Sequence, residues 1–203
     1  MRTTRRIFST ILVGGLLAAC STTGPALQTS DQAQLESIES YLNDLSAFEA
    51  QFTQAGTDGE AASQGKVWVD RPGRLRVQYD PPSSRFILAS HGRLLMVDPG
   101  SGETTRMPLS KTPLEILLQK TITFSGPVMV KSFLRFPNAT QITLVKRENP
   151  TQGALTLNFS DNPLAVTGMT VQDAYGHMIS LSVFNIQKQD SLPKSLFEQS
   201  VSS

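Results

Sequence analysis

The stretch GKVWVDRPGRLRVQYDPP, residues 65–82, decides the fold class of this chain. After the Pro72-Gly73 pair, the apolar residues Leu75, Val77 and Tyr79 alternate with polar ones, which is the period of a strand with one buried and one solvated face. A Pro-Gly pair suits a tight turn, because proline presets one backbone angle and glycine tolerates the next. The stretch therefore predicts β-structure with a tight turn at its centre.

Downstream of this stretch, short apolar runs alternate with turn residues. Residues 86–89 and 94–97 flank His91-Gly92 and predict a hairpin, and residues 98–102 predict a further turn. Thr112 and Pro113 are typical of the cap and first position of a short helix that carries Leu114, Leu117 and Leu118. Further strands are predicted at residues 141–145, 154–159, 169–173 and 178–186, with a turn at Tyr175-Gly176 between the last two.

Upstream, the pattern is helical. Thr29 and Gln32 match a capping box, and the run 56–59 of Gly, Thr, Asp and Gly predicts the helix end. Spacings of three and four predict one apolar helix face and one polar face: Leu35, Ile38, Leu42, Leu45, Phe48 and Phe52 on the first; Glu36, Glu39, Asn43 and Glu49 on the second. The fold class expected is α+β, with one antiparallel sheet of many short strands, a long first helix and a short middle helix.

Residues 1–19 read as a signal peptide, with a basic start and a short apolar stretch. They end in Leu17-Ala-Ala before Cys20, which matches the lipobox of bacterial lipoproteins, so we expect Cys20 to be acylated. The alternative is an ordinary secretory peptide with an incidental cysteine. Arg5-Arg6 leaves export by a twin-arginine signal open. Residues 20–30 would form a short tether, which reaches about 35 Å at most, and residues 31–203 one folded domain.

Charge and cysteine usage exclude several classes of protein. Cys20 is the single cysteine, so the domain cannot hold an internal disulfide. Cleavage before Cys20 removes three of the 18 basic residues and none of the 17 acidic ones, which leaves a net charge of −2. That balance argues against nucleic acid and against bulk anionic lipid as electrostatic partners.

A search for catalytic or metal-binding motifs finds none. The two histidines, His91 and His177, stand beside glycines at predicted turns, without a second ligand at zinc spacing. Residues 98–103 lack the spaced carboxylates that calcium requires, and Gly-rich phosphate loops are absent. We therefore expect neither an enzyme nor a cofactor.

The stretch 65–82 resembles the LolA family of outer-membrane lipoprotein carriers, in which a Trp-containing strand leads into Arg-Pro-Gly and an alternating strand. The resemblance continues at His91-Gly92, at residues 97–99 and 112–114, and at residues 173–176 and 184–185. It implies an incompletely closed antiparallel β-barrel, lidded by helices over an apolar cavity for lipoprotein acyl chains. Arg71 matches the family arginine that keeps the empty cavity shut. The residues expected to bind acyl chains are Trp68, Leu75, Val77, Tyr79, Phe86, Leu88, Leu94, Met96, Leu114 and Leu117.

The same residues have an alternative interpretation: Leu75, Val77 and Tyr79 as ordinary core, and Arg71 as a solvated turn residue. Two features depart from the family pattern, namely the lipobox and a chain that stops soon after Phe197. The resemblance implies a periplasmic monomeric carrier that takes lipoproteins from an inner-membrane transporter and passes them to an outer-membrane acceptor. The lipobox, followed by Ser21, also favours a lipid-anchored outer-membrane acceptor like LolB. A lipid-binding sensor of the envelope is the third alternative.

Overall fold

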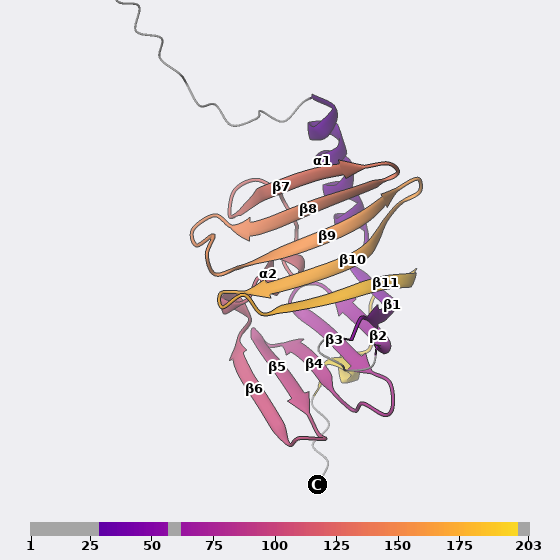
Figure 1. Cartoon of the computed structure of the whole chain (residues 1–203), viewed down its shortest axis with the longest axis vertical. Coiled ribbons are helices and arrows are strands. Elements are labelled where there is room, and N and C mark those ends of the chain that lie inside the picture. Colours follow the sequence, from indigo (N-terminus) through magenta and orange to yellow (C-terminus); the bar gives the residue numbers. More distant parts are fainter. Residues whose placement is uncertain (1–28, 57–61, 199–203) are drawn as a thin grey trace, which may run out of the picture.

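The computed structural model describes residues 29–56 and 62–198, so Cys20 and the predicted signal peptide and tether lie outside the described residues. Eleven strands form one antiparallel sheet in the order β6-β5-β4-β3-β2-β1-β11-β10-β9-β8-β7 (Figure 1). The strands are β1 Ala47–Gln54, β2 Ser63–Asp70, β3 Arg74–Tyr79, β4 Phe86–Ser90, β5 Arg93–Asp98, β6 Glu103–Pro108, β7 Val128–Phe136, β8 Ala139–Lys146, β9 Gly153–Asp161, β10 Leu164–Asp173 and β11 Met178–Lys188. The helices are α1 Thr29–Asp44 and α2 Leu114–Leu117, with short 3-10 turns η1 Leu109–Lys111 and η2 Lys194–Phe197.

The sheet stays open, with β6 and β7 as its two free edges. Most neighbouring strands are consecutive in sequence and form antiparallel hairpins. Strand β1 is an exception, because it pairs with β2 on one side and with β11 on the other, where Phe48 lies opposite Lys188. The first and last strands therefore meet in the middle of the sheet. The expected α+β class and the incompletely closed antiparallel sheet are confirmed.

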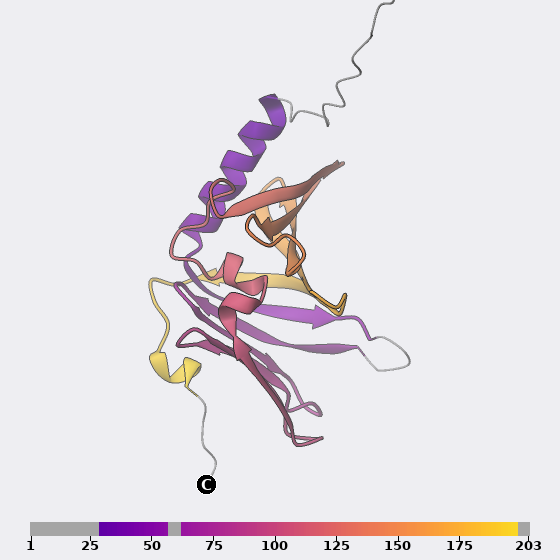
Figure 2. The ribbon, with the colours of Figure 1, turned by 90° about the vertical axis from the view of Figure 1, so that its left-hand side faces the viewer.

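Helices cover one face of the curved sheet, which we call the inner face; the opposite face is the outer face. Figure 2 shows α2 within the curve of the sheet and α1 along the half formed by β7–β10, while η2 lies across the outer face. Tyr41 of α1 packs edge-on against Phe159 of β9, with 6.2 Å between the ring centroids. None of the helices in the described ranges is both long and apolar enough to span a membrane.

The core fills the space between the inner face and the helices. Phe52 of β1 is fully buried and meets the Tyr79 ring edge-on at 5.1 Å between centroids. Gly65 of β2 allows this packing, because a Cβ there would lie 2.0 Å from the Gln78 carbonyl oxygen and 2.9 Å from the Phe52 ring. The remaining fully buried large side chains include Ile38, Leu75, Ile116, Ile122, Ile142, Leu144, Leu155, Leu157 and Phe159.

The prediction of one helix up to residue 56 is wrong. The helix ends at Asp44, where Leu45 N–H donates to the Tyr41 carbonyl, and Ala47–Gln54 is a strand. Phe48 and Phe52 are four residues apart, a spacing that fits a helix face and equally fits one face of a strand. Ala50 is also fully buried and Gln51 is exposed, so the alternation of a strand describes this segment.

The other predicted elements fare better. The hairpin at His91-Gly92, the turn at 98–102 and the four later strands are confirmed, with longer bounds than predicted. Strands β6 and β7 escaped prediction. Thr112 is not a side-chain cap of α2, because its hydroxyl donates to the Leu109 carbonyl and Pro113 holds the cap position. The proposed capping hydroxyl of Thr29 lies outside the described side chains.

We expect Phe52→Ala to lower the free energy of unfolding by about 3–5 kcal/mol, because it removes a fully buried ring and leaves a cavity under Tyr79. Denaturant unfolding followed by circular dichroism measures this loss. Phe136→Ala, at a ring that is 52% exposed, is the control and should change stability by less than about 1 kcal/mol. Equal losses in the two variants would contradict the packing described here.

Candidate functional site

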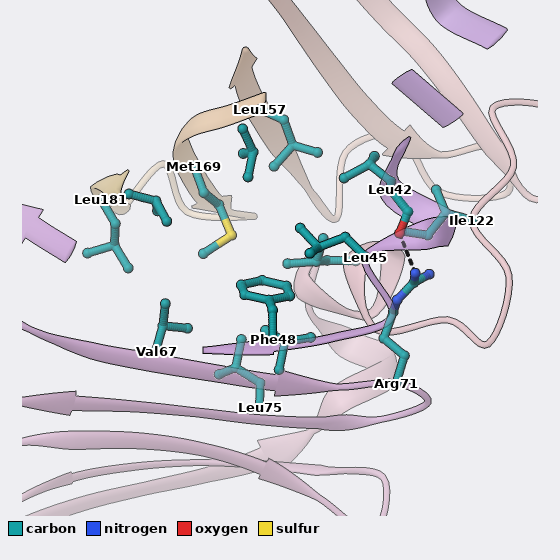
Figure 3. A pocket seen from close by; sticks show the side chains of 14 residues that line it. Leu42, Leu45, Phe48, Val67, Arg71, Leu75, Ile122, Leu157, Met169 and Leu181 are labelled. Carbon is teal, nitrogen blue, oxygen red and sulfur yellow. Dashed lines mark hydrogen bonds between the residues drawn. The ribbon is translucent and has the colours of Figure 1, made fainter. Parts of the chain in front are cut away.

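An apolar pocket lies between the inner face of the sheet and the helices (Figure 3). Fourteen residues line it, and Arg71 is the single polar one among them. The pocket spans both halves of the sheet, because β2 and β3 form one wall and β9, β10 and β11 form the other. The apolar lining consists of Leu42, Leu45, Phe48, Val67, Val69, Leu75, Leu117, Ile122, Leu157, Val166, Met169, Leu181 and Val183.

The free space inside this pocket is about 40 Å³, which is close to the volume of one water molecule. Pockets that hold drug-sized ligands enclose roughly 300–1,000 Å³. The protein's own side chains, such as Phe48 and Met169, occupy the middle of the pocket (Figure 3). The pocket therefore has no room for a long apolar ligand while the helices keep these positions.

Arg71 lies at the turn between β2 and β3 and bonds to both helical segments above the pocket. Its Nη2 donates to the carbonyl of Leu42, the bond dashed in Figure 3, and makes a longer contact of 3.4 Å with the Asn43 carbonyl. Its Nη1 lies 3.4 Å from the carbonyl of Gln119, just after α2. One guanidinium thus joins the end of α1, the segment after α2 and the sheet, as its five donors in a fixed plane allow.

The electrostatics of Arg71 are unusual for a buried cation. Only 8% of the residue is exposed, and within the described ranges its hydrogen-bond acceptors are backbone carbonyls rather than carboxylates. Burial lowers the pKa of the guanidinium, which nevertheless stays protonated at any physiological pH. The C-terminal carbonyls of α1 carry the negative end of the helix dipole and compensate part of the charge.

Two further polar side chains of α1 hold the segment after α2. The Asn43 amide donates to the Ile122 carbonyl at 2.8 Å and accepts from Ile122 N–H at 2.9 Å, so one side chain satisfies both backbone groups. Glu39 accepts the Phe124 N–H at 2.7 Å. Glu39 and Asn43 were predicted on the polar face of the helix, and there they bond the backbone groups of residues 122–124.

Helix α2 is fixed to the sheet at both ends. Gly73 N–H, at the turn beside Arg71, donates to the Leu118 carbonyl at 2.8 Å, and glycine suits this turn because its φ is +76°. At the other end, Lys146 of β8 pairs with Glu115 at 2.5 Å and donates to the Ser110 carbonyl. We call α1, α2 and residues 118–124 the lid, because hydrogen bonds and apolar contacts, rather than strand pairing, hold them over the pocket.

The structure brings together only some of the predicted acyl-binding residues. Arg71, Leu75 and Leu117 line the pocket. Tyr79 and Met96 border a second hollow of about 250 Å³ at the far end of the inner face, where burial raises the Tyr79 pKa and the charge of Arg85 opposes that shift. The remaining inner residues, Val77, Leu94 and Leu114, are buried in the main core around the pocket.

Trp68, Phe86 and Leu88 belong to the outer face. They pack in a separate small cluster with Phe197 of η2, since successive residues of a strand point to opposite faces, although Phe86 also borders the second hollow. The Trp68 indole donates to Glu49 at 2.9 Å, and the Arg76 guanidinium lies 5.0 Å from the Phe86 ring centre. These three residues are therefore left out of the candidate site.

Sequence reasoning missed the far wall of the pocket. Leu157, Val166, Met169, Leu181 and Val183 come from β9–β11. The signal was present, because the predicted strands 154–159 and 178–186 alternate and their apolar residues had to face the same core as Leu75. By contrast, nothing in the pattern of a helix marks Asn43 as the clamp for a backbone 79 positions away.

The two histidines have local structural partners. The His91 ring nitrogen lies 2.9 Å from the Ser90 hydroxyl, and the His177 ring lies 2.8 Å from the Asp173 carboxylate, a hydrogen bond that lowers the Asp173 pKa. Over residues 29–56 and 62–198, no three His, Cys, Asp or Glu side chains gather as metal ligands would.

Comparison with known proteins points to one family. Residues 43–200 match the family model described as outer membrane lipoprotein carrier protein LolA. An outer-membrane lipoprotein carrier protein of Methylobacillus flagellatus is 24% identical over 177 residues, which cover 81% of this chain and 83% of that protein. One of Chromohalobacter salexigens is 23% identical over 185 residues, 89% of this chain and 85% of that protein.

Among solved structures, a LolA superfamily protein from Nitrosomonas europaea aligns with a TM-score of 0.46 at 12% identity, and the alignment covers 81% of this chain and 97% of that one.

We expect Arg71→Leu to loosen the lid while the sheet stays folded. Losing charge-assisted bonds of about 1.5–3 kcal/mol should speed hydrogen exchange at the Ile122 and Phe124 amides by roughly tenfold or more. Mass-spectrometric or NMR exchange rates test this expectation. Arg76→Leu, at an outer-face arginine that donates to the Leu196 carbonyl, is the matched control. The same exchange rates in both variants would show that Arg71 does not hold the lid.

Proposed function

This chain belongs to the LolA family of outer-membrane lipoprotein carriers, and from that premise we propose that its lidded pocket binds the acyl chains of lipoproteins in the periplasm. Members of the family are carrier proteins, not enzymes. The observation that carries the proposal is the pocket wall, which is apolar at every lining residue except Arg71. Acyl chains are the one part of a lipoprotein that such a wall suits.

The energies of loading and closing support this function. Each methylene buried from water contributes about 0.8 kcal/mol, so a chain of about sixteen carbons gains on the order of 10 kcal/mol on entering an apolar site. The lid bonds of Arg71, Asn43 and Glu39 are worth about 1–3 kcal/mol each. An acyl chain can therefore open the lid, while the closed state weakens apparent affinity enough to permit release.

Closing also protects the empty protein. With the lid shut, Leu42, Leu45, Leu75 and Ile122 are all buried, so the unloaded pocket presents little apolar surface to water. Large exposed apolar patches otherwise promote association with the wrong partner. A carrier that alternates between these two states remains monomeric and soluble as a domain when it has no load.

We further propose that Cys20 is acylated and anchors the domain, as its lipobox indicates. The tether of about 35 Å at most would keep the pocket at one membrane face. This form acts as a local carrier or as an outer-membrane acceptor, which takes lipoproteins delivered to its own membrane. An inner-membrane transporter and a second carrier are the partners that this role requires.

The pocket assignment predicts that Val183→Glu abolishes acyl binding without unfolding the domain. Val183 lines the pocket but is only half-buried, so a carboxylate there can stay hydrated when the pocket is empty. An acyl chain entering beside it would strip that water at a cost of several kcal/mol. The affinity for a fluorescent fatty-acyl probe should fall at least a hundredfold, with a fall in melting temperature of only a few degrees.

Phe184→Glu is the matched control for Val183→Glu, because the next residue of the same strand is 42% exposed and does not line the pocket. It should keep the probe affinity within twofold of the unchanged protein. If both variants bind the probe normally, the acyl chain is held elsewhere and the proposed pocket is wrong.

The anchor predicts that Cys20→Ala releases the protein from membranes into the soluble periplasmic fraction. The thiol is the atom to which a diacylglyceryl group is attached, so alanine removes the attachment without touching residues 29–198. Fractionation and intact mass spectrometry of the wild-type protein measure both points. A wild type that is already soluble and unacylated would contradict the anchor and leave the free carrier.

A further inference from the structure

Two large apolar side chains are exposed to solvent on the edge strand β7. Leu134 is 46% exposed and Phe136 is 52% exposed. Phe133, which precedes Leu134 on β7, packs against the core. Because side chains alternate along a strand, Leu134 and Phe136 point to the outer face. Lys131 and Arg135 of the same strand are also exposed. We call Leu134 and Phe136 the β7 patch.

The first turn of α1 is fastened to this end of the sheet. Asp31 pairs with Arg135 of β7 at 3.3 Å. Gln34 donates to Asp161 at 3.3 Å, and Asp161 in turn accepts a 2.8 Å bond from Thr140 of β8. Figure 1 shows the start of α1 projecting beyond the β7 edge of the sheet. The chain before residue 29 is therefore attached to the fold close to the β7 patch, since Asp31 contacts Arg135, which lies between the two patch residues in sequence.

From this arrangement we propose that the β7 patch contacts the bilayer to which the chain is anchored. The inference rests on the acylated Cys20 of the proposed function. The tether is short, about 35 Å at full extension, and it attaches at the corner that carries the patch, so this corner is the part of the domain nearest the membrane. No other described element combines a position at the start of α1 with large exposed apolar side chains.

The chemistry of the patch suits a lipid–water interface. Phenylalanine and leucine gain free energy by entering the boundary between headgroups and acyl chains. Lys131 is exposed on the same strand, and its long side chain can keep the ammonium group at headgroup level. Three other large apolar residues are exposed in the described ranges. Tyr175 and Met178 lie at the opposite end of the strands, near the β10–β11 turn, and Phe184 lies on β11.

The orientation has a direct meaning for transfer. With the β7 corner on the bilayer, α1 runs from the membrane toward its end at Leu42 and Asn43, where Arg71 holds the lid. The latch then lies at the membrane-distal end of α1, about 24 Å from its start for a helix of 16 residues. A lipoprotein donor in the periplasm can reach that end without passing the anchor.

The test uses the mature acylated chain in vesicles of phosphatidylethanolamine and phosphatidylglycerol at about three to one. Ser132→Cys supplies a thiol for an NBD fluorophore on β7, on the same face as the patch, because the single native cysteine, Cys20, is blocked by its lipid. Quenching by nitroxide lipids reports contact with the bilayer. We expect strong quenching that falls at least twofold when Leu134→Ser and Phe136→Ser are added.

The matched control adds Met178→Ser and Phe184→Ser, which remove two apolar side chains of similar exposure at a distance from the patch. It should leave quenching at residue 132 unchanged. Equal quenching in both double variants would overturn the inference. NBD emission that changes with the density of protein on the vesicles, but not with nitroxide lipid, would also overturn it. That result would mean that two copies of the protein pair through β7.

Two measurements on the same samples separate this inference from the proposed function. Intact mass spectrometry reports whether Cys20 carries a lipid, and its absence would overturn both the anchor and the orientation. The fatty-acyl probe reports on the pocket, which the β7 substitutions do not touch, so its affinity should stay within twofold. Normal probe binding with unchanged quenching would overturn the membrane contact alone.

Discussion

The closed structure depends on one buried guanidinium. Arg71 stands where the β2–β3 turn, the end of α1 and the segment after α2 meet, and its donors reach carbonyls of both lid segments. A cation in such a place costs free energy unless its donors are used, so the bonds are needed for the arginine as much as for the lid. Moving the lid away exchanges carbonyl partners for water, which limits the cost of opening.

Strands β2–β4 serve two separate apolar surfaces. Their inner residues, such as Val69 and Leu75, form one wall of the pocket beneath the helices. Their outer residues, such as Trp68 and Leu88, lie under Phe197, and Arg74 stacks on that ring at 5.7 Å. The outer cluster thus packs η2 against the face of the sheet opposite the pocket. It provides a fixed wall against which the lid can move.

Alternation and turn residues predicted most of the sheet, because apolar and polar residues alternate in the sequence of a strand that is buried on one face only. They failed where one spacing serves two structures, as at Phe48 and Phe52, and at β7, whose exposed Leu134 and Phe136 blur the alternation. The family resemblance supplied the cavity and Arg71, which local pattern alone leaves as core and turn. Asn43 and Glu39 were beyond prediction, since their partners come from a distant loop whose backbone groups lack sheet or helix partners.

The meeting of β1 with β11 sets a condition on how the domain folds. Phe48 pairs with Lys188, a contact between residues far apart in sequence, and such non-local pairing makes folding slow. Val183 and Leu181 take their places in the pocket wall only after β11 has paired with β1. A partly folded chain can therefore have hairpins while it still lacks the enclosed pocket. The topology makes the pairing of β11 with β1 a prerequisite for an enclosed pocket.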